Sequence, residues 1–316
     1  MRAVQVLGDS SSPNLKTTSS AAKPVPKASG FLLRVHSAGI TGPELTWPEL
    51  YATPSRIPGH DISGVVVEVG SAYAGRYKVG DGVYGMLHAD GGEGQADFVA
   101  CTDEEVALKG PGLTHAEAAA LPIPLLTAWE VVAERGGIKD GTRVLVTGAS
   151  GAVGVMFVQL ARRLTGAYIV ALASGRHHET LRAFGAHETL DYAVPGWENT
   201  LRDIEVVFDT VGGEVLSKSW ETITDDGTIL TIGDPAPAWA FGGSPPAEAS
   251  RHPNVIYSHF IVSPDTTRLQ KGAEMVAEGT LKPIATKSFP FSDAEEAWAC
   301  AQGRGRGYKV VINFSE

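Results

Sequence analysis

The sequence is poor in cysteine, and this scarcity excludes two classes of protein. Only Cys101 and Cys300 occur among its 316 residues. Two thiols cannot build a disulfide framework or a four-cysteine structural zinc site. The chain is therefore expected to fold around hydrophobic cores, and its length is sufficient for two of them.

A long uninterrupted apolar segment is also missing. The longest apolar stretch, residues 118–133, contains Pro122, Pro124 and Glu130, so no membrane-spanning helix is expected. The N-terminus, MRAVQVLGDSSS, lacks the apolar core of a signal peptide. These features predict a cytoplasmic protein that does not act in a membrane.

Clusters of Lys and Arg are absent as well. The formal net charge is -10, and a negative protein repels a phosphate backbone unless it carries a basic patch. Nucleic acid is therefore not an expected partner.

What the sequence does contain is a glycine-rich turn between two apolar runs. Residues 144–146 form the first run, residues 155–164 have the apolar pattern of a helix, and residues 167–173 form the second run. Gly148, Gly151 and Gly154 lie in the turn, although Ala149 departs from the usual G-x-G-x-x-G spacing. Glycine lets backbone N–H groups approach a pyrophosphate, and the helix start adds partial positive charge. The pattern predicts the first unit of a dinucleotide-binding fold.

The end of the second apolar run indicates which dinucleotide binds. An NAD site usually places Asp or Glu here to hold the ribose 2′-hydroxyl. The sequence instead has Ser174 and Arg176, with no carboxylate before Glu179. A hydroxyl and a guanidinium suit a 2′-phosphate, so NADPH is the predicted cofactor.

The pattern of the chain changes near residue 113. Before it, short β-branched runs separated by glycine predict a compact β domain of barrel type, with a loop over Ser10–Gly30. Thr114 and Glu117 have the spacing of a helix capping box. After residue 143, strands and helices alternate, which predicts a doubly wound parallel sheet. A Pro- and Gly-rich loop over residues 234–253 is either a surface excursion or a lid.

Several motifs, taken in order, resemble the medium-chain dehydrogenase/reductase superfamily and its zinc-less quinone oxidoreductase and enoyl reductase branch. The motifs are GITGPE, IPGHDISGVVVEVG, VGDGVYG, AAALPIPLLTAWEVV, VLVTGASGAVG, LRAFGAHETLDY, VVFDTVGG and YKVVINF. The resemblance covers nearly the whole chain. It implies an α/β protein with a Rossmann-type doubly wound sheet domain, a GroES-like β-barrel catalytic domain, and frequent dimerisation.

The expected domain limits follow from this comparison. Residues 1–122 are expected to begin the GroES-like catalytic domain, residues 123–265 to form the NADPH-binding Rossmann domain, and residues 266–316 to return to the catalytic domain. The resemblance also implies which residues line the cofactor site: Thr127, Ser150, Gly151, Ala152, Val153, Ser174, Arg176, Tyr192, Val211, Gly233, Phe260, Ile261, Val262 and Lys309.

No metal is expected. Zinc-dependent relatives carry ligands where Thr41, His60 and Pro124 stand, and only His60 can bind zinc. One imidazole cannot hold a catalytic zinc, which needs three protein ligands.

The candidate catalytic residues are Thr41, Tyr51 and His60. His60 is either a proton donor or a buried neutral histidine satisfied by backbone. Tyr51 and Tyr84 can each protonate an enolate or simply pack. Thr41 and Glu44 stand where quinone oxidoreductases commonly carry Asn and Asp, so the hydrogen bonds to substrate are expected to differ from theirs.

These observations favour an NADPH-dependent oxidoreductase that reduces a quinone or an α,β-unsaturated carbonyl without zinc. The expected partner is a small electrophilic substrate, and the expected assembly is a homodimer. Two alternatives stay open: a pathway-specific enoyl reductase of secondary metabolism, and an NADPH-binding sensor or structural protein without turnover.

Overall fold

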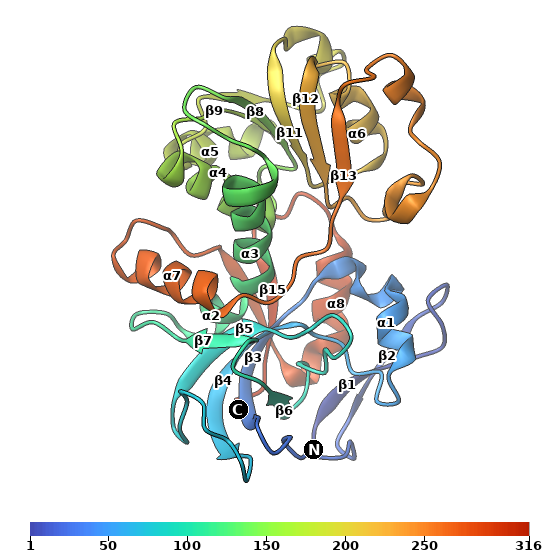
Figure 1. The fold of residues 1–316 in the computed structure, drawn as a ribbon. Helices are drawn as coiled ribbons and strands as arrows, with labels where there is room; N and C mark the ends of the chain where they lie inside the picture. The colour runs from blue at the N-terminus through green and yellow to red at the C-terminus, as the bar shows by residue number, and fades with distance from the viewer. Residues whose placement is uncertain (316) are drawn as a thin grey trace. The chain divides into compact units, whose positions relative to one another are not determined.

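Two sets of residues pack separately in the computed structural model, which describes residues 1–315 (Figure 1). The first unit comprises Met1–Leu126, Ser263–Arg304 and the residues from Tyr308 onward. The second unit comprises Thr127–Val262 and Gly305–Gly307. The first unit is therefore discontinuous in sequence.

The first unit is built on a seven-stranded sheet with the order β14-β15-β3-β4-β5-β7, in which β6 also pairs with β3, along Phe31–Arg34. Its strands are β3 (Phe31–Gly39), β4 (Asp61–Val69), β5 (Gly82–Met86), β6 (Phe98–Cys101), β7 (Val106–Leu108), β14 (Thr286–Pro290) and β15 (Lys309–Asn313). The last strand pairs antiparallel with β3, with Val311 opposite Gly39. The C-terminal segment thus completes a sheet that the N-terminal segment begins.

The N-terminal segment forms a short hairpin, and its second strand lies where the sequence predicted a loop. β1 (Ala3–Leu7) pairs antiparallel with β2 (Asn14–Thr18). The Asp9 carboxylate accepts the Ser11 amide at 2.9 Å and closes the turn. The prediction of a continuous loop over Ser10–Gly30 is therefore wrong for residues 14–18, because pairing with β1 orders a polar segment of weak strand propensity.

Helices of the first unit are α1 (Pro48–Ala52), α2 (His115–Ala119), α7 (Thr266–Ala277) and α8 (Ala294–Gln302), while α3 (Pro122–Glu130) continues into the second unit. The capping box is confirmed at α2: Thr114 accepts the Glu117 amide, and the Glu117 carboxylate accepts the Thr114 amide. The core of this unit combines β-strand residues such as Leu33 and Val310 with Trp298 of α8.

The second unit has a six-stranded parallel sheet with the order β10-β9-β8-β11-β12-β13, whose strands run side by side in Figure 1. The strands are β8 (Arg143–Thr147), β9 (Tyr168–Leu172), β10 (Glu188–Leu190), β11 (Ile204–Asp209), β12 (Ile223–Thr231) and β13 (Ile256–His259). The connecting helices are α4 (Ala152–Leu164), α5 (His178–Phe184) and α6 (Gly213–Ser219). The predicted doubly wound fold is confirmed.

The chain order changes direction across β8, since β9 lies on one side of it and β11 on the other. In open parallel sheets, ligands bind at the carboxyl ends of the strands next to such a switch point. The fold therefore directs attention to the turns after β8, β9, β11 and β12.

Candidate active site

The turn after β8 leaves backbone amides available to an anion. Gly148 has a φ of +59°, which favours glycine, and a Cβ on Gly154 would lie 2.6 Å from the Ala149 Cα. The helix α4 starts after Gly151, and no side chain caps its first N–H groups. A helix N-terminus with uncapped amides attracts a pyrophosphate. Ser150 is buried at this turn, and Ala152 and Val153 are half-buried at the helix start.

The turn after β9 holds the residues expected at the adenosine end. The Ser174 hydroxyl oxygen is buried and has no hydrogen-bond partner among residues 1–315. Arg176 is exposed, and its guanidinium donates to the Gly305 carbonyl at 2.5 Å and to the His177 ring at 3.2 Å. Tyr192 is also exposed. An unpartnered hydroxyl beside an arginine fits a ribose phosphate.

A carboxylate that the sequence analysis missed lies at the same turn. Asp191 follows β10 and accepts the Gly175 amide at 2.9 Å and the Ala193 amide at 2.9 Å. These backbone hydrogen bonds lower the pKa of Asp191. The usual spacing rule looks for the acidic residue at the end of the second strand itself. Here the sheet brings the carboxylate from the neighbouring strand. A carboxylate typical of NADH sites and an arginine typical of NADPH sites therefore lie at the same turn.

The other residues expected in the cofactor groove differ in exposure. Thr127, Gly233, Phe260 and Val262 are buried, Val211 is half-buried and Ile261 is exposed. The Arg135 guanidinium lies over the Phe260 ring, 4.7 Å from its centroid. Their contact with a cofactor stays a prediction.

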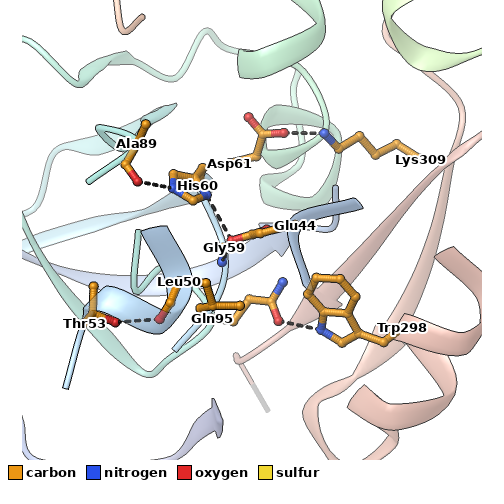
Figure 2. Close-up of polar contacts among 10 residues, drawn as sticks. All are labelled: Glu44, Leu50, Thr53, Gly59, His60, Asp61, Ala89, Gln95, Trp298 and Lys309. Carbon is orange, nitrogen blue, oxygen red and sulfur yellow. Dashed lines mark hydrogen bonds and ion pairs between the residues drawn. The ribbon is translucent and has the colours of Figure 1, made fainter. Parts of the chain in front are cut away.

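His60 lies in the first unit and is held by Glu44, as Figure 2 shows. The Glu44 carboxylate oxygen Oε1 lies 2.9 Å from His60 Nδ1 and accepts the Gly59 amide at 2.5 Å. Glu44 is 0% exposed and His60 is 6% exposed. The predicted alternative of a neutral histidine satisfied by backbone missed this carboxylate, because Glu44 lies on another element, η1 (Gly42–Thr46).

Two opposing effects set the pKa of His60. Burial lowers the pKa, while the charge of Glu44 and its hydrogen bond raise it, with the Ala89 carbonyl and Asp61 adding to the increase. The net direction is upward. His60 is therefore held as an imidazolium over a wider pH range than a free histidine.

Lys309, the first residue of β15, forms a buried ion pair with Asp61, the first residue of β4 (Figure 2). Asp61 also accepts the Ile123 amide at 2.7 Å. Burial raises the pKa of Asp61, and Lys309 opposes this change. The ammonium that was predicted to line the cofactor site thus has a carboxylate partner, and its cofactor contact stays a prediction.

The remaining hydroxyl candidates differ in their hydrogen bonds. Tyr51 donates to the Leu45 carbonyl at 2.6 Å, and burial raises its pKa. Tyr84 is 0% exposed and donates to the Leu269 carbonyl at 2.5 Å, which favours the packing alternative. Thr41 is half-buried and precedes η1 without capping it through its side chain. Within residues 1–315, no group of three or more His, Cys, Asp or Glu side chains can hold a metal ion.

Comparison with known proteins identifies the family. Residues 27–130 match the alcohol dehydrogenase GroES-like domain, and residues 184–312 match the zinc-binding dehydrogenase family. The chain belongs to the medium-chain dehydrogenase/reductase superfamily. Within it, the chain resembles the zinc-less quinone oxidoreductase and enoyl reductase branch. The matched family is described as zinc-binding. In this chain, however, two of the three places where zinc-dependent relatives carry a ligand, at Thr41 and near Pro124, have no zinc ligand.

Named relatives agree with this placement. The chain is 33% identical over 268 residues to the 2-methylene-furan-3-one reductase of Solanum lycopersicum, covering 81% of this chain and 63% of that protein. It therefore spans less than two thirds of that relative. It is 31% identical to the chloroplast envelope quinone oxidoreductase homolog of Arabidopsis thaliana, covering 81% of this chain and 79% of that one.

A solved quinone oxidoreductase from Coxiella burnetii has the same fold, with a TM-score of 0.81, 24% identity and 99% coverage of both chains. The named sequence relatives are oxidoreductases, and this chain is accordingly an oxidoreductase of the superfamily, for which a nicotinamide cofactor is indicated. No helix within residues 1–315 has the length and hydropathy needed to cross a bilayer.

Proposed function

We propose that this oxidoreductase uses NADPH to reduce a quinone or the C=C bond of an α,β-unsaturated carbonyl, without zinc. The observation that carries the proposal is the Glu44–His60 pair. It provides an imidazole with a raised pKa, in a chain that has only one of the three ligands that a catalytic zinc needs. The named functions of the tomato and Arabidopsis relatives support the substrate class.

The proposed chemistry separates into a cofactor part and a proton part. When bound, NADPH supplies the hydride to the electron-poor carbon of the acceptor. The accompanying proton comes from His60 Nε2, because its contact with the Ala89 carbonyl oxygen is long, at 3.4 Å, whereas Nδ1 lies 2.9 Å from the Glu44 carboxylate. Imidazolium is a stronger acid than the Tyr51 phenol, whose pKa is raised. Thr41 is the candidate hydrogen-bond donor to the substrate carbonyl.

The residues proposed to hold the cofactor belong to the second unit. The uncapped amides at the start of α4 hold the pyrophosphate, and Ser174 and Arg176 hold the 2′-phosphate. Thr127 is proposed to contact the nicotinamide half. Each of these groups binds and orients the cofactor, and none takes part in proton transfer.

The proposed function is tested by following oxidation of NADPH or NADH with metal-free protein. Quinones, enones and simple aldehydes serve as acceptors. Turnover of quinones or enones with a preference for NADPH supports the proposal. Turnover restricted to aldehydes, or activity that requires added zinc, contradicts it.

The cofactor preference can be tested with two opposite variants. Arg176→Ala removes the 2′-phosphate partner and should weaken NADPH binding by roughly 1.5–3 kcal/mol, with little effect on NADH. Asp191→Asn removes a carboxylate from the same turn and should favour NADPH over NADH by a few fold, about the size of a screened charge pair. Isothermal titration with both cofactors measures each change. An equal loss of both cofactors in Arg176→Ala contradicts the placement of the 2′-phosphate.

We also propose that the protein is a homodimer, as the family resemblance predicts. The supporting feature is strand β13, which ends the sheet order and pairs only with β12 among the described strands. Ile256 on this strand is 65% exposed. An edge strand with exposed apolar residues is a template for pairing with another chain.

A further inference from the structure

Asp209 is a buried carboxylate at the end of β11 that no cation neutralises. It is 0% exposed and forms no ion pair within residues 1–315. Its oxygens instead accept four hydrogen bonds. Two come from the Thr147 and Thr231 hydroxyls, each at 2.6 Å, and two from the Gly212 and Val211 amides, at 2.9 and 3.2 Å. Burying a carboxylate costs free energy unless hydrogen bonds or an opposite charge compensate for the lost water.

These hydrogen bonds join three neighbouring strands at their carboxyl ends. Thr147 is the last residue of β8, and Thr231 is the last residue of β12. In the sheet, β11 lies between β8 and β12. One carboxylate thus fixes the spacing of three strand ends beside the switch point.

Thr147 and Thr231 also form hydrogen bonds with the turns that follow β11 and β12. The Thr147 hydroxyl oxygen also accepts the Thr210 amide at 3.1 Å, and the Thr231 hydroxyl oxygen accepts the Gly233 amide at 2.9 Å. A Cβ on Gly148 would lie 2.4 Å from the Thr210 hydroxyl, and one on Gly233 would lie 2.6 Å from the Gly212 Cα. The turn after β11 therefore packs closely against the turns after β8 and β12.

The turn after β9 is held by a different group. Its amide at Gly175 donates to Asp191, and within residues 1–315 Asp209 forms no hydrogen bond with this turn. Ser174 and Arg176 lie on this separate turn. The two halves of the expected cofactor groove thus depend on different carboxylates.

We infer that Asp209 is a positioning residue for the pyrophosphate and nicotinamide half of the cofactor, acting through Thr147 and Thr231, and not for the adenosine half. This inference rests on the proposed cofactor site. A carboxylate is required because it only accepts hydrogen bonds, and all four of its partners donate. An amide at this position turns an N–H group toward donors, which leaves buried groups unsatisfied.

The test compares binding of NADPH with binding of 2′,5′-ADP, which contains only the adenosine half. Calorimetric titrations use Asp209→Asn, Thr147→Val and Thr231→Val. Thr222→Val is the matched control, because Thr222 is also buried and donates to the Ser219 carbonyl at 2.8 Å, away from the groove turns. The groove variants should bind NADPH at least about tenfold more weakly while their affinity for 2′,5′-ADP changes by less than about twofold.

Each outcome decides the inference. A selective loss of NADPH affinity in the groove variants, absent from Thr222→Val, supports it. An equal loss of affinity for NADPH and 2′,5′-ADP, or the same loss in Thr222→Val, would mean that Asp209 has only a structural role. Either result overturns the inference. If Asp209→Asn does not fold, the two threonine variants carry the test. Wild-type protein that binds neither ligand refutes the proposed function itself, whereas normal wild-type binding with unaffected variants refutes only the role of Asp209.

Discussion

At the scale of single residues, the Glu44 carboxylate influences the protonation of His60. A raised folded-state pKa means that the pair stabilises the fold fully at pH values below the unfolded histidine pKa of about 6.5. This contribution is lost as pH rises through the folded-state pKa. In the proposed mechanism, the acid form of His60 is lost over the same range, so activity should fall there too.

Glu44→Gln tests this coupling. Without the carboxylate charge, the effect of burial dominates, and the pKa of His60 should decrease. The alkaline fall in kcat should move to lower pH with it. NMR titration of the His60 Cε1 proton and a pH–rate profile measure the two changes.

The control for this experiment is Glu49→Gln, which makes the same substitution at an exposed position of α1. It should leave the His60 titration unaltered. An unchanged pKa of His60 in Glu44→Gln would show that the carboxylate does not govern its protonation.

At the scale of elements, the start of α4 is defined by contact between its first turn and the preceding loop. Gly154 is the residue that permits this contact, because a Cβ there would meet both the Ala149 Cα and the Gly148 carbonyl oxygen at 2.6 Å. The neighbouring atoms are backbone, which cannot move aside without shifting the helix. The helix N-terminus and the proposed pyrophosphate site therefore depend on this one glycine.

Gly154→Ala should destabilise the second unit by about 1–3 kcal/mol, the usual cost of overpacking. It should also weaken binding of the intact cofactor, since the α4 amides move away from the turn. Thermal unfolding and NADPH titration measure the two effects. Gly91→Ala is the comparison variant, because a Cβ there meets its nearest atom at an ordinary 3.5 Å. If both alanines leave Tm unchanged, close packing does not define the start of α4.

At the scale of the whole molecule, the expected assembly is two copies joined through β13. Ile256→Lys places two like charges near each other in such a dimer, and that arrangement costs several kcal/mol. The variant should therefore be monomeric at concentrations where the wild type is dimeric, as measured by sedimentation velocity. Val194→Lys is the control, because Val194 is exposed but follows β10 at the opposite edge of the sheet. A monomeric wild type at micromolar concentration, or dissociation by Val194→Lys alone, is incompatible with a β13 dimer.

Features that depend on short stretches of chain were predictable. The glycine turn between two apolar runs specifies strand, turn and helix, because glycine positions and hydrophobic periodicity act locally. The Thr114–Glu117 capping box is another example, since its two hydrogen bonds span three residues. The two apolar runs predicted at residues 144–146 and 167–173 match β8 and β9 for the same reason. The β1–β2 hairpin was missed because its second strand is polar and forms only through pairing.

The sequence by itself determined the fold class, the family and the place of the glycine-rich turn, because these depend on local patterns and on motifs in a fixed order. Only the tertiary structure decided which groups act together. Glu44 reaches His60 across 16 residues, Asp191 reaches Gly175 across 16, and Asp209 reaches Thr147 across 62. No local pattern encodes such partners, because the folding of the sheets brings them to the same place and burial then makes their charges consequential.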